Sequence, residues 1–155
     1  MLKFYNYDIV FQEIPDEVTL AINISNCPNH CKSCHSPWLW EDKGNDLSEE
    51  TLSSLLKKYY HDITCVCFMG GDNNPSEVQH LATYLHKQQI TPVKVGWYSG
   101  KPTLPTGIDK ELFHYIKMGP YIEKLGGLKS KDTNQRLYKI EGNNINDITY
   151  RFWKK

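Results

Sequence analysis

The stretch CPNHCKSCH, residues 27–35, spaces three of the chain's five cysteines by three and then two residues. Thiolates at Cys27, Cys31 and Cys34 can fold around one 4Fe-4S cluster and bind three of its irons. Electron-transfer clusters ordinarily use four cysteines. The fourth iron would then need a ligand from outside the chain. The spacing therefore predicts a cluster that takes part in chemistry rather than one that only stores an electron.

Two other interpretations of this stretch stay open at this point. Residues 31–35 also fit the C-x-x-C-H pattern of c-type haem attachment, although that attachment normally happens outside the cytoplasm. The three cysteines together with His30 or His35 would also suit a zinc ion. The other two cysteines, Cys65 and Cys67, lie in an apolar run and are predicted to be small buried hydrophobic residues.

Strand and helix patterns alternate along the chain around this stretch. The proline at position 75 suits the first turn of a helix, and Leu112, Phe113 and Ile116 follow Asp109 at helical spacing. The expected strands are residues 18–24, 63–69, 93–98 and 136–140, and the expected helices begin near 46–48, 74–75 and 109. This order favours parallel strands joined by crossover helices.

Three unusual segments each follow one of these strands directly. Residues 27–35 follow the first strand, Gly70-Gly71-Asp72 the second and Tyr98-Ser99-Gly100 the third. Ligands of parallel α/β folds gather at the carboxyl ends of the strands. The three segments are therefore expected to converge on one site.

Length and charge narrow the class of protein. The 155 residues suit a single domain, 1–155, and 18 basic residues balance 18 acidic ones. A neutral chain argues against nucleic acid as the main partner, which would favour a basic face. No apolar run approaches the roughly 20 residues that a membrane helix needs, and the start has no signal-peptide pattern. We therefore expect a cytoplasmic protein with no membrane partner.

These motifs resemble the radical S-adenosylmethionine (SAM) superfamily. Its C-x-x-x-C-x-x-C hallmark is matched by the three cysteines, and its Gly-Gly-Glu-type motif by residues 70–72, with Asp72 in place of Glu. Most of the superfamily has an aromatic residue where this chain has Ser33. A small residue there resembles the anaerobic ribonucleotide reductase activating proteins. Further segments resemble that subfamily: YDIV at 7–10, GWYSG at 96–100, GPYI at 119–122 and TNQR at 133–136. Met118 departs from the acidic residue that many members of the subfamily carry just before the Gly-Pro pair.

The resemblance implies an α/β fold, a partial (βα) barrel of mostly parallel strands that is open on one side. It implies a 4Fe-4S cluster held by the three cysteines and SAM bound to its fourth iron. It also implies that SAM contacts two groups of residues, namely Ser33, Cys34 and His35, and Gly70, Gly71 and Asp72. On this assignment, a Gly71→Val change is expected to weaken SAM binding without loss of cluster colour.

The resemblance further implies an enzyme whose chemistry is carried by the cluster and SAM rather than by a catalytic side chain. A flavodoxin-type donor would reduce the cluster, SAM would be cleaved, and a glycyl radical would form on anaerobic ribonucleoside-triphosphate reductase. The alternatives are an activase of another glycyl-radical enzyme, such as pyruvate formate-lyase, and a radical SAM enzyme acting on a small molecule. Roles for His30 and His35 beside the cluster, and for Arg136 as an anion ligand or a strand brace, stay open.

Overall fold

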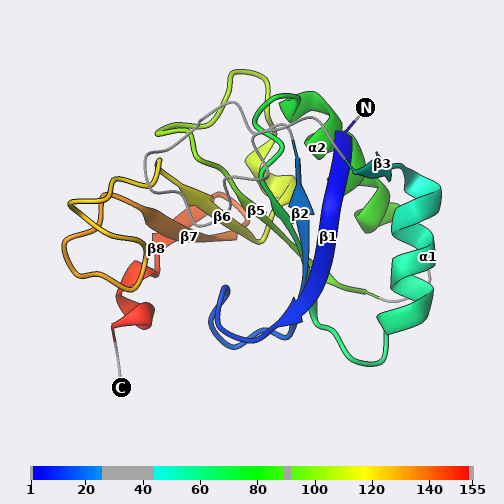
Figure 1. Ribbon diagram of the computed structural model, residues 1–155, viewed down its shortest axis with the longest axis horizontal. Coiled ribbons are helices and arrows are strands. Elements are labelled where there is room, and N and C mark those ends of the chain that lie inside the picture. The colour runs from blue at the N-terminus through cyan, green and yellow to red at the C-terminus, as the bar shows by residue number, and fades with distance from the viewer. Residues whose placement is uncertain (1, 26–43, 89–91, 154–155) are drawn as a thin grey trace.

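A computed structural model describes residues 2–25, 44–88 and 92–153 (Figure 1). In these residues the strands form one eight-stranded sheet in the order β3-β1-β2-β4-β5-β6-β7-β8. The strands are β1 Leu2–Val10, β2 Thr19–Ile24, β3 Asn45–Leu47, β4 Cys65–Met69, β5 Lys94–Tyr98, β6 Tyr115–Met118, β7 Arg136–Glu141 and β8 Asn144–Asp147.

The four central strands, β2, β4, β5 and β6, run parallel to one another. β1 and β3 extend one edge of the sheet antiparallel, and β7 and β8 extend the other edge in the same way. The predicted strands at 18–24, 63–69, 93–98 and 136–140 are confirmed, and so is parallel pairing of the first three. The carboxyl ends of β2, β4, β5 and β6 therefore meet at one edge of the fold.

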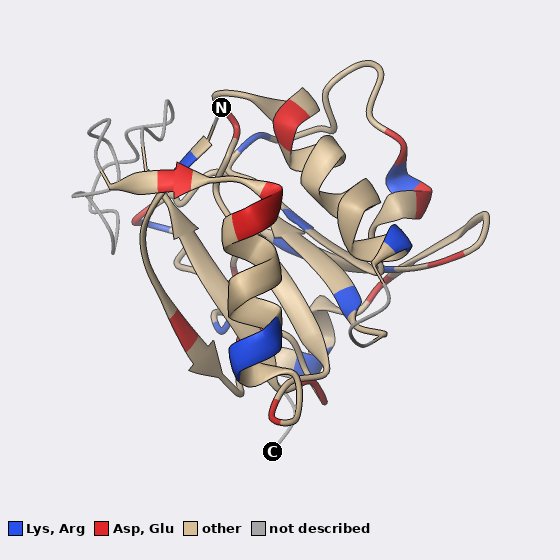
Figure 2. Ribbon diagram, turned by 90° about the vertical axis from the view of Figure 1, so that its right-hand side faces the viewer, with Lys and Arg blue, Asp and Glu red and all other residues tan. Residues whose placement is uncertain are grey.

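Helices α1 Glu49–Tyr59 and α2 Pro75–Lys87 cover one face of the sheet (Figures 1 and 2). Ser48 caps α1 by accepting a hydrogen bond from the Thr51 N–H, and acidic residues begin the helix while lysines end it. Pro75 stands in the first turn of α2, where its missing N–H costs nothing. Both helices bury the apolar faces that the sequence predicts.

The two faces of the sheet have different cores. Val66 and Phe68 of β4 face the helices and belong to the larger apolar cluster. Cys65 and Cys67 alternate with them and point to the helix-free face, where Ile14 packs against them. Both cysteines are fully buried free thiols, which confirms their prediction as core residues.

The predicted third helix is wrong. Only the 3₁₀ helix η2, Lys110–Leu112, forms after Asp109, and Ile116 lies in β6 instead. Tyr115, Ile116 and Lys117 pair with β5, so tertiary strand pairing overrides the helical spacing of the apolar residues. A second 3₁₀ helix, η3 Thr149–Phe152, follows β8.

β1 and the edge strands β3 and β8 were not predicted. The burial of β1 does not alternate cleanly, and β3 and β8 are three and four residues long. The partial barrel stays a prediction: what is observed is a mixed sheet with both α helices on one face.

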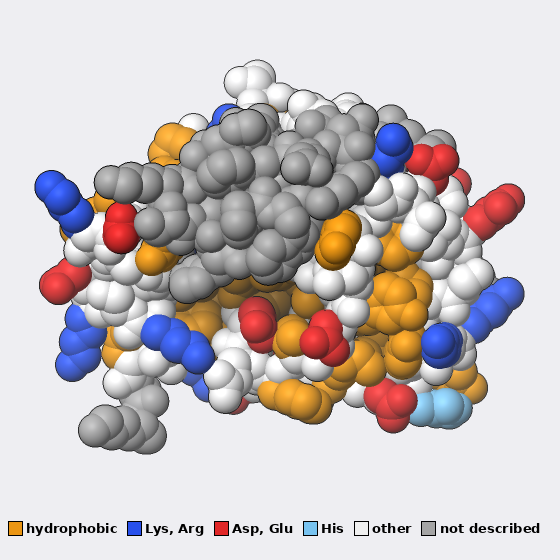
Figure 3. All heavy atoms as spheres, viewed as in Figure 1, with side chains coloured by type: hydrophobic (Ala, Val, Ile, Leu, Met, Phe, Trp, Pro, Cys, Tyr) orange, Lys and Arg blue, Asp and Glu red, His pale blue; other side chains and the backbone are white. Residues whose placement is uncertain are grey.

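Figure 3 shows hydrophobic side chains gathered at the surface over β1 and α1. Between these two elements, Tyr7 of β1 and Tyr59 of α1 meet edge to face, with ring centroids 5.8 Å apart. None of the helices in the described residues has both the length and the apolar character to cross a membrane.

Candidate functional site

Hydrogen bonds join the two turns that follow β4 and β5. The Asp72 carboxylate accepts from the Ser99 hydroxyl at 2.5 Å and from the Gly100 N–H at 2.8 Å. Ser99 is 1% exposed and Asp72 8%. The two segments predicted to converge after the second and third strands are therefore in direct contact.

A second set of contacts fixes the turn at Gly70. The indole N–H of buried Trp97 donates to the Gly70 carbonyl at 2.7 Å, and the Gly70 N–H donates to the Tyr98 carbonyl at 2.9 Å. The Gly71 carbonyl accepts from the Asn74 N–H at the start of α2. Each peptide group of the turn is thus oriented by an identified neighbour.

Both glycines of this turn are required by the backbone. Gly70 and Gly71 have φ values of +112° and +90°, which residues with a Cβ rarely adopt. A Cβ on Gly70 would lie 3.2 Å from the Ile24 carbonyl oxygen, and one on Gly71 would lie 2.6 Å from a methyl group of Val78. A Gly71→Val change would therefore strain the fold itself, so it cannot isolate an effect on ligand binding.

Gly70 also lies beside the strand that leads into the cysteine stretch. A Cβ on Gly70 would meet Ile24, the last residue of β2, and Cys27 follows Ile24 by three positions. Ser25 is held to β1 by a hydrogen bond from its N–H to the Lys3 carbonyl at 3.0 Å. The chain therefore leaves the described sheet toward its cysteines from a point next to the Gly-Gly turn.

The end of β6 joins the same edge of the sheet. The buried Lys117 ammonium donates to the Ser99 carbonyl at 3.2 Å and to the Gly119 carbonyl at 2.9 Å. Gln135 donates to the Gly119 carbonyl at 3.4 Å, and Asn134 donates to the Pro120 carbonyl at 3.1 Å. The two C-terminal segments singled out in the sequence thus contact each other. Lys117 was not predicted, although a lysine inside an apolar run is an unusual signal.

A cavity of about 510 Å³ opens on the helix-free face below these turns. Met69 and Tyr98, which directly precede the Gly70 and Ser99 turns, form part of its wall. Burial raises the pKa of the Tyr98 phenol well above its usual value, and the phenol donates to the Glu13 carbonyl. The lining combines apolar side chains with a few polar groups, a composition typical of ligand sites. Other residues of the wall are Glu13, Lys117, Gln135 and Phe152.

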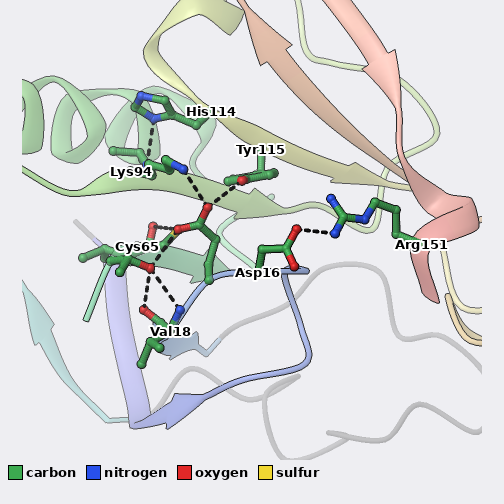
Figure 4. Close-up of polar contacts among 11 residues, drawn as sticks. Asp16, Val18, Cys65, Lys94, His114, Tyr115 and Arg151 are labelled. Carbon is green, nitrogen blue, oxygen red and sulfur yellow. Dashed lines mark hydrogen bonds and ion pairs between the residues drawn. The ribbon is translucent and has the colours of Figure 1, made fainter. Parts of the chain in front are cut away.

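The opposite end of the same strands carries a different polar cluster (Figure 4). The Glu17 carboxylate, 6% exposed, accepts from Lys94 at 2.8 Å, Tyr115 at 2.7 Å and Thr64 at 2.7 Å. Burial alone raises the pKa of Glu17, but these three donors and the charge of Lys94 outweigh it and leave the pKa below its usual value. This cluster ties the β1–β2 connection to the starts of β5 and β6.

The thiols in β4 are poor metal ligands. Burial raises the pKa of Cys65 to about 12 and that of Cys67 well above its usual value. Metals bind the thiolate form, which this environment disfavours. Within residues 2–25, 44–88 and 92–153, no three His, Cys, Asp or Glu side chains are arranged to hold a metal ion.

Several predicted site residues lie outside the described part of the chain: Cys27, His30, Cys31, Ser33, Cys34 and His35. Gly70, Gly71 and Asp72 do lie together at one edge of the sheet. Arg136 pairs with Asp147 at 3.6 Å and lies over the Trp153 ring, contacts that brace the last strands. These contacts fit the brace considered for Arg136, and its role as an anion ligand stays a prediction.

A family model described as a 4Fe-4S single cluster domain matches residues 18–112. The matched segment begins one residue before β2 and ends with η2. It therefore contains the cysteine stretch and the turns after β4 and β5. No curated protein and no solved structure gives a match to the chain.

Proposed function

The chain belongs to the 4Fe-4S single cluster domain family, and from that premise we propose that it is a radical SAM activase. In this proposal it generates a glycyl radical on anaerobic ribonucleoside-triphosphate reductase and takes its electron from a flavodoxin-type donor. The family match favours an iron-sulfur cluster over the zinc and haem interpretations. The finer assignment rests on the arrangement of the turns together with the sequence resemblance.

One observation carries the proposal. Gly70 packs against the carbonyl of Ile24, three residues before Cys27, while Asp72 is bonded to Ser99 and Gly100. Three segments far apart in sequence are thus drawn to one edge of the parallel strands.

The cysteines that would hold the cluster are chosen by elimination as well as by spacing. Cys65 and Cys67 are buried in the sheet with raised pKa values. Cys27, Cys31 and Cys34 are the other three cysteines of the chain. Three thiolates leave one iron open for a ligand from outside the protein.

The Gly-Gly turn suits the methionine end of SAM. The two glycines carry no side chain that could block a ligand, and Asp72 supplies a negative charge for an ammonium group. Residues 33–35 would line the other side of SAM. When bound, the cluster and SAM supply the radical chemistry, and the chain's own residues bind, orient and shield them.

The partial barrel is part of the same proposal. The parallel strands β2, β4, β5 and β6 form the centre of the sheet, and α1 and α2 cover only one face. The other face carries the cavity. This supports a half-open interior that can receive a reacting group at the carboxyl ends of the strands.

The cavity favours one second candidate, a radical SAM enzyme that acts on a small molecule. Its volume of about 510 Å³ lies in the range of small-molecule sites. The same cavity could equally take a loop of a protein substrate, as the activase proposal requires. A glycyl radical signal in the presence of the reductase would therefore distinguish a protein substrate from a small molecule.

The test is anaerobic reconstitution with iron and sulfide, followed by EPR of the dithionite-reduced protein with and without SAM. The expected result is a reduced 4Fe-4S signal that changes when SAM is added. Adding an anaerobic ribonucleoside-triphosphate reductase should then give a glycyl radical signal. A cluster indifferent to SAM would refute the radical SAM assignment, whereas a SAM response without a glycyl radical would refute only the activase step.

A further inference from the structure

We propose that Ser99 is a positioning residue that sets the Gly70-Gly71-Asp72 turn for the methionine end of SAM. This inference rests on the proposed function. Ser99 follows β5 and belongs to no predicted ligand set. Its importance comes from where its hydroxyl and its carbonyl lie.

The Ser99 hydroxyl uses both of its hydrogen-bonding capacities. It donates to Asp72 Oδ1 at 2.5 Å and accepts from the Lys101 N–H at 3.1 Å. The donor bond is short because its acceptor is a carboxylate. The hydroxyl therefore fixes the Asp72 side chain and the course of the chain after β5 at the same time.

The neighbours of Ser99 hold the remaining groups of the turn. Trp97 donates to the Gly70 carbonyl, and the Gly100 N–H donates to the second oxygen of Asp72. Residues 97–100 thus form hydrogen bonds with the first and the last residue of the turn, Gly70 and Asp72. Without the hydroxyl, Asp72 Oδ1 loses this hydrogen bond, which weakens the hold of residues 97–100 on the carboxylate.

The Ser99 backbone connects these hydrogen bonds to β6. Its N–H donates to the Lys117 carbonyl at 2.9 Å, and its carbonyl accepts from the Lys117 ammonium at 3.2 Å. Lys117 also lines the cavity. Ser99 consequently links the turn after β4, through Asp72, to Lys117 in the cavity wall.

The chain contains a matched control for the loss of such a hydroxyl. Thr149 is fully buried, donates to Asp147 Oδ1 at 2.6 Å and accepts from the Leu137 N–H at 2.8 Å. This hydroxyl has the same pair of partner types, but it belongs to η3 and bonds to β7. Thr149→Val should thus carry a similar structural cost without touching the turn.

The test compares Ser99→Ala, Ser99→Thr and Thr149→Val in the reconstituted full chain. SAM affinity is read from the SAM-dependent change in the EPR signal of the reduced cluster. Because a charge-assisted hydrogen bond is lost, we expect Ser99→Ala to weaken SAM binding about tenfold. Its iron content should match that of the unmodified protein. Ser99→Thr should bind within about twofold of the unmodified protein, since it keeps the hydroxyl.

Thr149→Val should lower the melting temperature and leave SAM affinity unchanged. Normal SAM affinity in Ser99→Ala, or an equal loss in Thr149→Val, would overturn the inference. Hydrogen exchange of a peptide covering residues 70–74 separates this inference from the proposed function. Faster exchange in Ser99→Ala alone supports positioning even if the unmodified protein ignores SAM, which would defeat only the proposed function.

Discussion

The parallel strands carry a buried carboxylate at each end, and the two carboxylates are held in different ways. At the carboxyl ends, Asp72 accepts from the uncharged donors Ser99 and Gly100. At the amino ends, Glu17 accepts from the charged Lys94 and from two hydroxyl groups. Glu17 is thus part of an ion pair with Lys94.

The backbone around the two ends differs in the same sense. Gly70, Gly71 and Gly119, which follow β4 and β6, all have positive φ. No glycine immediately precedes β4, β5 or β6 at the other end. A carboxylate with three donors, one of them charged, suits a structural brace. In the proposed function, the end with the glycine turns serves the chemistry, while the end with Glu17 serves stability.

The largest effect should follow from removing one of the three cysteines of residues 27–34. We expect Cys31→Ala to abolish reductive SAM cleavage, because the cluster would lose one of three thiolates. Cys65→Ala, in the buried part of β4, should retain the activity. The measurement is 5′-deoxyadenosine formed with dithionite under anaerobic conditions. Wild-type turnover by Cys31→Ala would contradict the cluster assignment.

The next effect concerns stability alone and follows from disrupting the Glu17 cluster at the amino ends of the strands. Glu17→Gln removes the charge that Lys94 pairs with and weakens the contacts of Tyr115 and Thr64. Since the Lys94 side chain is 45% exposed and can regain water, the expected loss is about 2 kcal/mol, below that of a fully buried ion pair.

Urea unfolding measures this loss, and SAM affinity of the folded variant should stay unchanged. Lys94→Met provides the partner variant, and a double-mutant cycle gives the energy of the pair itself. A Glu17→Gln protein that is fully stable yet unable to bind SAM would reverse the comparison between the two ends.

The sequence predicted the carboxyl-end site better than the amino-end brace, for a physical reason. Periodicity located β2, β4 and β5, and parallel strands necessarily bring their following turns together. The pairing of Asp72 with Ser99 follows from that geometry. Glu17 has partners 47, 77 and 98 positions away, on elements whose side-chain directions no local pattern reveals.

Local spacing also failed where pairing with a neighbouring strand decided the structure. Leu112, Phe113 and Ile116 suit one face of a helix, but β5 offers an open edge to residues 115–118. β1 was missed because its exposed residues interrupt the alternation on which strand prediction relies. Such elements are fixed by tertiary contacts rather than by intrinsic propensity.

A smaller effect should appear in the pH dependence of stability. Because the pKa of Glu17 is lowered in the folded protein, its contribution is fully present above the pKa of the unfolded chain, about 4.3. It is lost as the pH falls through the lower folded value. The stability gap between the unmodified protein and Glu17→Gln should thus be constant near neutrality and shrink below about pH 4.

Urea titrations at several pH values measure this gap, and subtracting the two proteins cancels the other carboxylates. A gap that widens as the pH falls would mean that the pKa of Glu17 is raised in the folded state. In that case the hydrogen bonds of Glu17 would not outweigh its burial, and the charged carboxylate would not stabilise the folded protein.

The smallest effect should come from the residue beside Glu17. Asp16 pairs with Arg151 of η3, but their side chains are 66% and 37% exposed. Exposed ion pairs contribute little because water and salt screen them, so Arg151→Ala should cost about 0.5 kcal/mol, and less at high salt. Urea unfolding at two salt concentrations measures it. A cost equal to that of Glu17→Gln would show that position at the amino end, rather than burial of the carboxylate, gives this region its stabilising role.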